Sequence, residues 1–237
     1  MDDCASTEAA SGAARRVRSE LAGAASSRAR PDKNEWRTDA HASAYLARAD
    51  QYRRDEGEAT LWELVPATAT RVLDLGTGDG RLLARLRAHC AFAEAVAVDF
   101  SPTMLAAARE RFAGDRSVTV VEHDLDRSLP DTLGSFDVVV SSFAIHHVED
   151  ARKRALYAEV FDRLEPGGLF ANLEHVSSPT PRLHERFYSF IDAGEDPSNK
   201  LVPVDVQLAW LRDIGFDDVD CYWKWRELAL LAGVKPS

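Results

Sequence analysis

Short apolar runs alternate with stretches of helical spacing through the middle of the chain. The runs are nearly continuous in apolar residues, which is typical of strands buried on both faces of a parallel sheet. They lie at residues 72–75, 95–99, 118–121, 136–142 and 169–174. The stretches expected to form helices between them are residues 81–90, 102–112 and 151–164. This alternation predicts an α/β fold with a doubly wound, mostly parallel sheet.

The C-terminal part of the chain has a different pattern. Polar residues there alternate with Val219, Cys221, Trp223 and Trp225. This period of two predicts a strand with one exposed face. Residues 228–232 read as a final strand, and a helix before the pair is expected to end at Gly215. A turn is expected at residues 164–168, before the fifth apolar run. The five runs and the C-terminal pair together predict a sheet of seven strands.

A glycine-rich turn, Gly-Thr-Gly-Asp-Gly at residues 76–80, follows the first apolar run. Glycine lets the chain turn sharply and lets a ligand touch the backbone, while the N–H groups of the next helix point into the same space. Asp74, just before the turn, favours a positively charged ligand and opposes a bare phosphate. The dinucleotide fingerprint requires a glycine at position 81, which is arginine here. By itself the turn leaves open whether the ligand is a dinucleotide or a small molecule of another class.

Acidic residues also end the next two strands. Asp99 follows Asp74 by 25 residues and is suitably placed to accept both hydroxyls of a ribose. Phe100 could cover one face of an adenine ring, and Asp124 could accept a hydrogen bond from its amino group. The three strand ends together indicate a ligand that contains adenosine.

Five motifs resemble, in order and spacing, those of the class I S-adenosylmethionine-dependent methyltransferases: residues 72–80, 98–102, 124–125, 136–141 and 164–168. The resemblance runs from about Tyr45 to the C-terminus. It implies a Rossmann-like fold whose last strand is antiparallel, with S-adenosyl-L-methionine as cofactor. Thr77 departs from the Cys or Ala that the family often has, but only backbone and a small side chain are needed there. The implied cofactor contacts are Asp74, Gly76, Thr77, Gly78, Gly80, Asp99, Phe100, Met104, Asp124, Leu125 and Ser141.

The chain is expected to have an N-terminal addition before this domain. We expect a disordered tail at 1–30, an N-terminal helical cap at 31–65, and the methyltransferase domain at 66–237 with a substrate-side insertion at 177–203. Tyr45, Ala49 and Tyr52 share one helical face of the cap. This face either packs on the domain or belongs to a lid over the site.

Methyl transfer requires little chemistry from a protein, because the sulfonium already activates the methyl group. The protein must hold both partners in a near-attack geometry, and a side chain that removes a proton contributes roughly 10²–10⁴-fold. The candidates near the strand ends are His146, His147, Glu174 and His175. Adjacent residues on a turn are not expected to face one pocket, so we expect at most one of the paired histidines to be catalytic. The pair lacks zinc spacing, and no metal is expected.

The composition of the chain restricts the chemical class of the acceptor and the cellular compartment. The net charge is −10, from 29 basic and 39 acidic residues, whereas nucleic-acid enzymes normally carry a basic face. A small molecule is therefore favoured over nucleic acid. Cys4, Cys90 and Cys221 form no metal or disulfide pattern, and no apolar run reaches the roughly 20 residues of a membrane helix. These features indicate a cytoplasmic protein without a membrane partner, and leave its oligomeric state open.

The function hypothesis is a methyltransferase that uses S-adenosylmethionine and methylates a small molecule by in-line displacement. Methylation of RNA, for example transfer RNA, is the first alternative, and a non-catalytic protein that binds the cofactor is the second. A third alternative is an enzyme that modifies the sulfonium itself. An arginine near the methyl group would indicate this chemistry, and Arg53 and Arg212 are the candidates.

Overall fold

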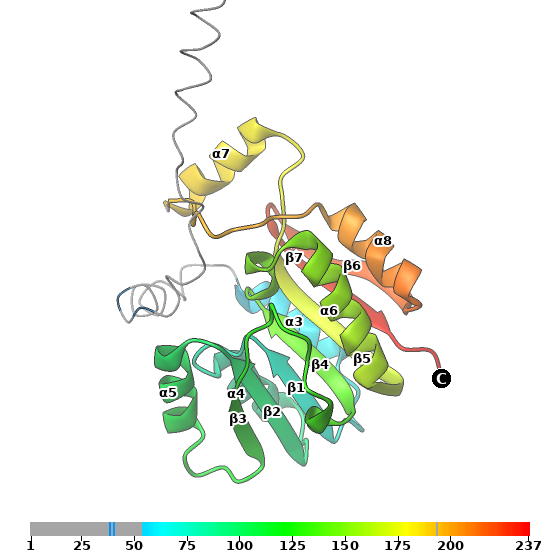
Figure 1. The fold of residues 1–237 in the computed structure, drawn as a ribbon. Coiled ribbons are helices and arrows are strands. Elements are labelled where there is room, and N and C mark those ends of the chain that lie inside the picture. Colours follow the sequence, from blue (N-terminus) through cyan, green and yellow to red (C-terminus); the bar gives the residue numbers. More distant parts are fainter. Residues whose placement is uncertain (1–37, 39, 41–53, 193) are drawn as a thin grey trace, which may run out of the picture. The chain divides into compact units, whose positions relative to one another are not determined.

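The computed structural model describes residues 38, 40, 54–192 and 194–237 (Figure 1). The expected tail at 1–30 lies outside the described residues, as does the stripe formed by Tyr45, Ala49 and Tyr52. Of the expected cap, helix α3 (Arg54–Leu64) is described.

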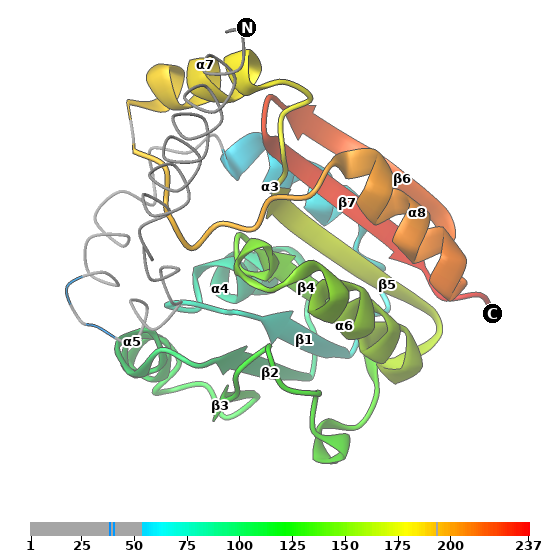
Figure 2. The ribbon, with the colours of Figure 1, turned by 45° about the horizontal axis from the view of Figure 1, so that its top comes forward.

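Seven strands form one sheet in the order β3-β2-β1-β4-β5-β7-β6. Strands β1 to β5 are parallel, while β7 is antiparallel to its neighbours β5 and β6 (Figure 2). The predicted fold is therefore confirmed, including the single antiparallel strand. The strands are β1 (Arg71–Leu75), β2 (Glu94–Asp99), β3 (Val118–Glu122), β4 (Phe136–Ser142), β5 (Leu164–His175), β6 (Asp217–Trp225) and β7 (Leu228–Val234).

Helices cover both faces of the sheet. Helices α6 and α8 pack on one face and α3 and α4 on the other, as Figure 2 shows. The other helices whose bounds are described are α5 and α7 and two short 3₁₀ helices, η3 and η4. Their bounds are α4 (Arg81–His89), α5 (Pro102–Arg111), η3 (Asp131–Leu133), η4 (Ile145–His147), α6 (Asp150–Arg163), α7 (Pro181–Ile191) and α8 (Val204–Ile214).

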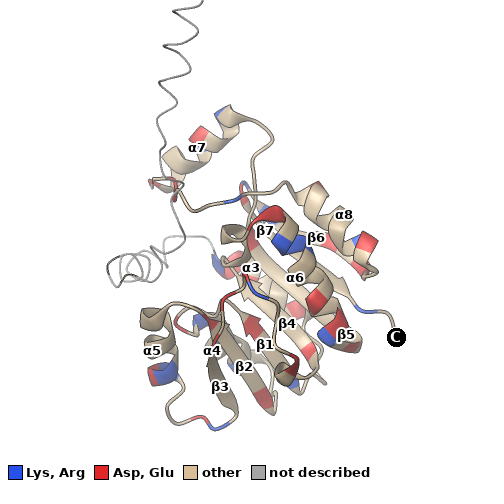
Figure 3. Cartoon of the chain, viewed as in Figure 1, with Lys and Arg blue, Asp and Glu red and all other residues tan. Residues whose placement is uncertain are grey.

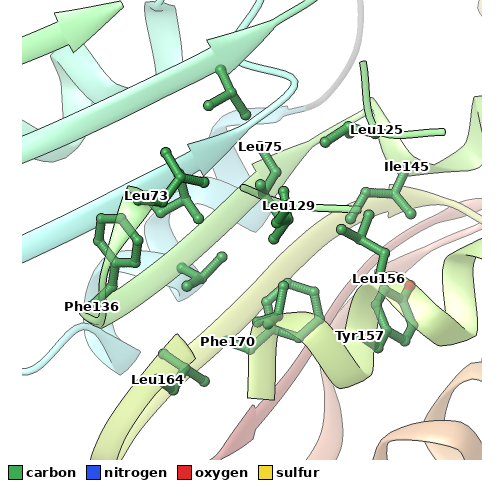
Figure 4. Packing of buried hydrophobic residues seen from close by; sticks show 14 of the residues in the cluster. Leu73, Leu75, Leu125, Leu129, Phe136, Ile145, Leu156, Tyr157, Leu164 and Phe170 are labelled. Atoms are coloured by element: carbon green, nitrogen blue, oxygen red, sulfur yellow. The ribbon is translucent and has the colours of Figure 1, made fainter. Parts of the chain in front are cut away.

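The core follows from the alternation of side chains along the strands. Leu73 of β1 faces the α6 side, where it joins Tyr157 and Phe170 in the cluster of Figure 4. Val72 and Val138 face the α4 side. Since both faces are covered, Val72, Leu73 and Leu75 of β1 are apolar, and Asp74 occupies a buried position near the carboxyl end of the strand. A buried acid at that point marks the edge of the sheet as chemically distinct.

Two local expectations were wrong or incomplete. The turn expected at residues 164–168 belongs to β5, because Leu164 pairs with Phe136 and the ladder resumes at Leu169 after a shift in register. Gly167 has φ +77°, which lets the strand bulge there without leaving the sheet. The second difference is α7, a helix that the pattern did not predict within the expected insertion.

Within the part of the chain that the structure describes, no helix combines the length and apolarity needed to cross a membrane.

Candidate active site

A cavity of about 890 Å³ opens at the carboxyl ends of β1, β2 and β3. We name it the acidic cavity after four of the residues that line it: Asp74, Asp79, Asp99 and Asp124. The carboxyl edge of a parallel sheet is where ligands bind in open α/β folds.

The structure brings most of the predicted cofactor contacts together in this cavity. Besides the predicted acids, the lining includes Gly76, Thr77, Gly78, Phe100, Met104 and Leu125. Gly80 and Ser141 do not line it. Gly80 starts α4 with its Cα against the Phe112 ring, and the Ser141 hydroxyl donates a 2.8 Å hydrogen bond to the carbonyl of Leu75 inside the sheet. Because successive strand residues face opposite sides, Ser142 lines the cavity instead.

Asp74 is a buried acid whose two oxygens differ. Its Oδ2 accepts a 2.6 Å hydrogen bond from the Thr77 hydroxyl. Its Oδ1 is buried and has no hydrogen-bond partner within the described residues. Burial raises the pKa of this carboxyl to about 7. A positively charged ligand group would pair with Oδ1 and return the carboxyl to its ionised form.

Two further buried polar atoms at the same cavity have no partner among the described residues: His123 Nε2 and Ser142 Oγ. Buried polar groups in folded proteins nearly always have hydrogen-bond partners. Three unpartnered atoms at one cavity therefore indicate a polar ligand that supplies the missing bonds.

Asp99 fixes the glycine turn to the end of β2. One oxygen accepts a 2.9 Å hydrogen bond from the Gly78 N–H, and the other accepts a 2.8 Å bond from the Ser101 N–H. A carboxylate can accept about four hydrogen bonds, so both oxygens retain capacity for ligand hydroxyls. Burial raises the pKa of Asp99, and the backbone N–H groups counteract that rise.

The two glycines of the turn that line the cavity have different tasks. At Gly76 (φ +68°) a Cβ would lie 2.2 Å from the Cβ of Ala144, so the backbones pack too closely for any side chain. At Gly78 (φ +57°) a Cβ would have one neighbour within 4 Å, the Met104 sulfur at 4.0 Å. The space beside the Gly78 Cα is therefore part of the acidic cavity.

The buried Asp74 carboxyl predicts a stability that depends on pH. Its pKa is about 7 against an ordinary value of 3.8, so between these values the ligand-free folded chain holds a proton that the unfolded chain has released. Stability should therefore fall as the pH rises through this window. Asp74→Asn should remove part of this dependence and raise the unfolding free energy at about pH 8 by a few kcal/mol. Urea unfolding at about pH 5 and pH 8 checks it, and a variant no more stable than wild type at the higher pH contradicts it.

A second cavity, of about 510 Å³, adjoins the first. We name it the histidine cavity, because His146, His147 and His175 line it. Its apolar walls come from β7 and from α7 within the expected insertion, and from the residue after β4: Phe143, Phe187, Tyr188, Ile191 and Leu228. Arg54, Phe143 and His147 line both cavities, and we call these three residues the shared wall.

His146 and Glu174 form a buried pair beside the histidine cavity. His146 Nδ1 lies 2.6 Å from Glu174 Oε1, which also accepts a 2.8 Å hydrogen bond from the His175 N–H. Asn172 donates a 3.2 Å bond to the other Glu174 oxygen. Burial, with His175 nearby, holds the pKa of His146 well below its usual range, and burial raises that of Glu174 to about 7. When Glu174 is ionised it holds the Nδ1 proton, which leaves Nε2 of a neutral His146 to accept one.

The other two histidine candidates also line this cavity. The rings of His146 and His147 lie 4.1 Å apart and are tilted by 50°, so the expectation that adjacent histidines would not face one pocket was wrong. Both histidines belong to the 3₁₀ turn η4, and of the two only His147 also lines the acidic cavity. His147 Nδ1 lies 2.9 Å from the Ser198 hydroxyl, and His175 Nε2 lies 2.9 Å from the buried Glu227. Glu174 does not line the cavity, and its carboxylate contacts the ring of His146, which does.

Arg54 is a site residue that the sequence pattern did not indicate. It is buried, and its guanidinium lies 5.0 Å from the centre of the Phe143 ring. The buried stripe of α3 has a helical period, but two of its four members are charged: Arg54, Gly57, Glu58 and Leu61. A hydropathy pattern therefore does not identify this stripe as the buried face of α3. Of the two arginines that were considered, Arg212 donates to the carbonyl of Val219 and lines neither cavity, while Arg53 lies outside the described residues.

Phe143 of the shared wall has an unusual backbone, with φ +51°. A non-glycine residue in this region is strained, and such strain is concentrated at functional sites. Its N–H donates a 2.8 Å hydrogen bond to the carbonyl of Leu173, which holds the strained turn against β5. A main-chain hydrogen bond therefore holds the shared wall at Phe143.

Comparison with known proteins agrees with this geometry. A family model described as a methyltransferase domain matches residues 72–168. A demethylmenaquinone methyltransferase of Clavibacter sepedonicus is 32% identical over 202 residues, which cover 76% of this chain and 79% of that protein. The ubiquinone/menaquinone biosynthesis C-methyltransferase UbiE of Dinoroseobacter shibae is 36% identical over 132 residues, which cover 54% of this chain and 52% of that protein. An O-methyltransferase family protein from Burkholderia thailandensis has a similar fold, with a TM-score of 0.70, 22% identity and coverage of 86% of this chain and 63% of that one.

Proposed function

Because the chain belongs to the class I S-adenosylmethionine-dependent methyltransferases, we propose that its acidic cavity holds S-adenosylmethionine and its histidine cavity a small-molecule acceptor. The observation that carries this proposal is the shared wall, which makes the two cavities neighbours at one boundary. A methyl group on one side of that boundary can meet a nucleophile on the other side. Charge supports a small acceptor, since basic and acidic residues are interspersed on the described helices (Figure 3).

The acidic cavity fits the chemical groups of this cofactor. Asp74 Oδ1 would pair with the amino group of the methionine part, and Asp99 with the ribose hydroxyls. Phe100, Leu125 and Asp124 would hold the adenine ring. These acids suit a ligand with two positive charges, an ammonium and a sulfonium.

Arg54 is our candidate for the carboxylate of the methionine part. A carboxylate among four acids needs a cation, and the described lining of the acidic cavity contains two, Arg54 and Arg81. Of these two, Arg54 lines both cavities, whereas Arg81 lines the acidic cavity alone. The guanidinium of Arg54, at the shared wall, can bind a carboxylate through two parallel hydrogen bonds.

The sulfonium supplies an electrophilic methyl group and a thioether leaving group. The protein then has two tasks, to align the acceptor with that methyl group and to take the proton that the acceptor loses. His146 is the proposed general base, and the Glu174 carboxylate would orient its ring and stabilise the imidazolium that forms. His175, held by Glu227, would orient the acceptor by a hydrogen bond. The acceptor gains a methyl group and loses one proton, which passes to His146 and then to solvent.

We propose that the acceptor is an aromatic ring that carries an ionisable hydroxyl, as a reduced quinone does. The two bacterial relatives are named for demethylmenaquinone and for ubiquinone and menaquinone biosynthesis. Aromatic and aliphatic side chains at the histidine cavity, Phe187, Tyr188 and Leu228 among them, suit a flat apolar ring. Loss of a hydroxyl proton to His146 would increase electron density on the ring oxygen and on the adjacent ring carbon.

A direct assay tests this proposal. The full chain is mixed with S-adenosylmethionine that carries a tritiated methyl group and with a short-chain demethylmenaquinol kept reduced. The labelled methyl group should appear in the organic extract, and more slowly when the quinone is left oxidised. Transfer RNA in a parallel reaction should stay unlabelled. Label on the RNA, or cofactor binding without transfer to any reduced quinone, would contradict the proposed acceptor.

Asp99→Ala should weaken S-adenosylmethionine binding by at least about tenfold, because two charge-assisted hydrogen bonds to the ribose are lost. Calorimetric titration measures this affinity. Asp131→Ala is the matched control, since that aspartate is exposed at the start of η3 and lines neither cavity. Unchanged affinity in Asp99→Ala would refute the ribose role, and no binding heat in the wild type at millimolar cofactor would remove the cofactor assignment.

A further inference from the structure

Lys153 of α6 carries a buried charge that neither cavity uses. Its side chain is 1% exposed, and it lines neither the acidic nor the histidine cavity. Its ammonium group donates a 3.0 Å hydrogen bond to the exposed carboxylate of Asp150 and a second bond to the main-chain carbonyl of Lys200. Taking an ammonium group out of water costs free energy. A buried lysine is therefore expected to have a role that a neutral side chain could not perform.

The carbonyl that Lys153 binds belongs to a segment that forms part of the histidine cavity. We name residues 196–202 the acceptor loop, because Asp196 and Asn199 line that cavity. The loop is attached to the histidine turn by its main chain, since the Lys200 N–H donates a 2.8 Å hydrogen bond to the carbonyl of His146.

Side chains add two more bonds between the acceptor loop and the histidine turn. The Lys200 ammonium donates to the carbonyl of His147 at 2.9 Å, and the Ser198 hydroxyl lies 2.9 Å from His147 Nδ1. Ser198 also donates a 2.7 Å hydrogen bond to Asp196. Lys153 therefore anchors, from α6, the same residue, Lys200, whose N–H is bonded to the turn carrying His146.

We propose that Lys153 is a positioning residue for methyl transfer: its buried ammonium anchors the acceptor loop against the histidine turn and holds the base His146 in place for the acceptor. This inference rests on the proposed function, in which His146 takes the acceptor proton. Lys153 itself touches neither cofactor nor acceptor.

The charge of Lys153 also acts on the proton equilibrium of the base. It lowers the pKa of His146 and that of Glu174, so it favours a neutral histidine beside an ionised carboxylate. That is the state in which Nε2 of His146 can accept a proton. The other charged or titratable groups that act on this pair are Arg54 of α3, His147 of η4, His175 of β5 and Asp196 of the acceptor loop.

Two variants separate the anchor from the charge. Lys153→Met removes both, whereas Lys153→Gln keeps a donor for the Lys200 carbonyl and removes the charge. Lys235→Met is the matched control, because the Lys235 ammonium donates a 2.8 Å bond to the carbonyl of Leu164 at the opposite end of β5. Cofactor binding should be unchanged in all three.

Two measurements test the proposal, and one of them needs no acceptor. Histidine-labelled protein saturated with S-adenosylhomocysteine is titrated by nuclear magnetic resonance. His146 should titrate at a higher pH in both Lys153 variants than in wild type or Lys235→Met. With a reduced demethylmenaquinone analogue as probe, Lys153→Met should lower kcat/KM at least about tenfold, mainly through KM, and should move the rising limb of the pH profile upward.

An unchanged His146 titration in Lys153→Gln, or unchanged KM in Lys153→Met, would overturn the proposed role of Lys153. If Lys153→Met does not fold, Lys153→Gln gives both readouts. If the wild type transfers no methyl group to any reduced quinone, the acceptor proposal fails, but the histidine titration still decides the role of Lys153.

Discussion

Replacing His146 with alanine is expected to lower the rate of methyl transfer by about 10²–10⁴-fold, the usual contribution of a placed general base. Cofactor affinity should stay at the wild-type level, because His146 does not line the acidic cavity. The loss should appear mainly in kcat, since the base acts on the reacting acceptor and not on its binding. Steady-state rates with a reduced demethylmenaquinone analogue, together with calorimetric titration of the cofactor, measure both quantities.

Two companion variants make this experiment decisive. Glu174→Gln should also slow transfer, because an amide cannot stabilise the imidazolium that forms on His146. His89→Ala is the matched control, since that histidine stacks on Trp62 at the end of α4 and lines neither cavity. Loss of cofactor binding in His146→Ala, or full activity in that variant, would show that His146 is structural and not the base.

Gly76→Ala is expected to destabilise the fold by about 2–4 kcal/mol and to abolish cofactor binding. The new methyl group would lie 2.2 Å from Ala144 Cβ, and the residue would be held at φ +68°. Overpacking of this kind costs about 1–3 kcal/mol, and the left-handed backbone adds about 1 kcal/mol. Urea unfolding measures the first effect and calorimetric titration the second.

Gly78→Ala is the informative comparison. Its Cβ would have the Met104 sulfur alone as a neighbour, at 4.0 Å, so stability should fall by only the backbone cost of about 1 kcal/mol. Cofactor affinity should nevertheless drop at least about tenfold, because the methyl group would fill ligand space. Gly114→Ala, with open space and an ordinary φ, should change neither quantity. Wild-type affinity in Gly78→Ala would contradict the assignment of that space to the cofactor.

The fold was predictable from the sequence because local pattern and tertiary burial agree. The apolar runs that became β1, β2, β4 and β5 are buried on both faces, so periodicity and burial give the same answer, whereas β3 at the edge of the sheet is only partly buried. The alternation at Val219 to Trp225 likewise matches β6 at the edge of the sheet. The bulge at Gly167 was mistaken for a turn, because a Pro-Gly-Gly stretch has the same signal whether the chain leaves the ladder or bulges within it.

The cofactor side of the site was more predictable than the acceptor side. Asp74, Asp99 and Asp124 each lie at or near the carboxyl end of a strand, and parallel strands bring such ends to one edge. The histidine cavity instead combines η4, α7 and a loop far along the chain, and no spacing rule links Phe187 or Asn199 to His146. Arg54 and Lys153 were missed for a related reason, since buried charges look like surface residues in a hydropathy pattern.

One measurement tests the central claim most directly: the crystal structure of the full chain with S-adenosylhomocysteine bound. The account requires the adenine beside Phe100, the amino group against Asp74, and the sulfur facing the shared wall of Arg54, Phe143 and His147. A sulfur that points away from this wall, or a ligand bound elsewhere, would separate the two cavities in function and contradict the mechanism.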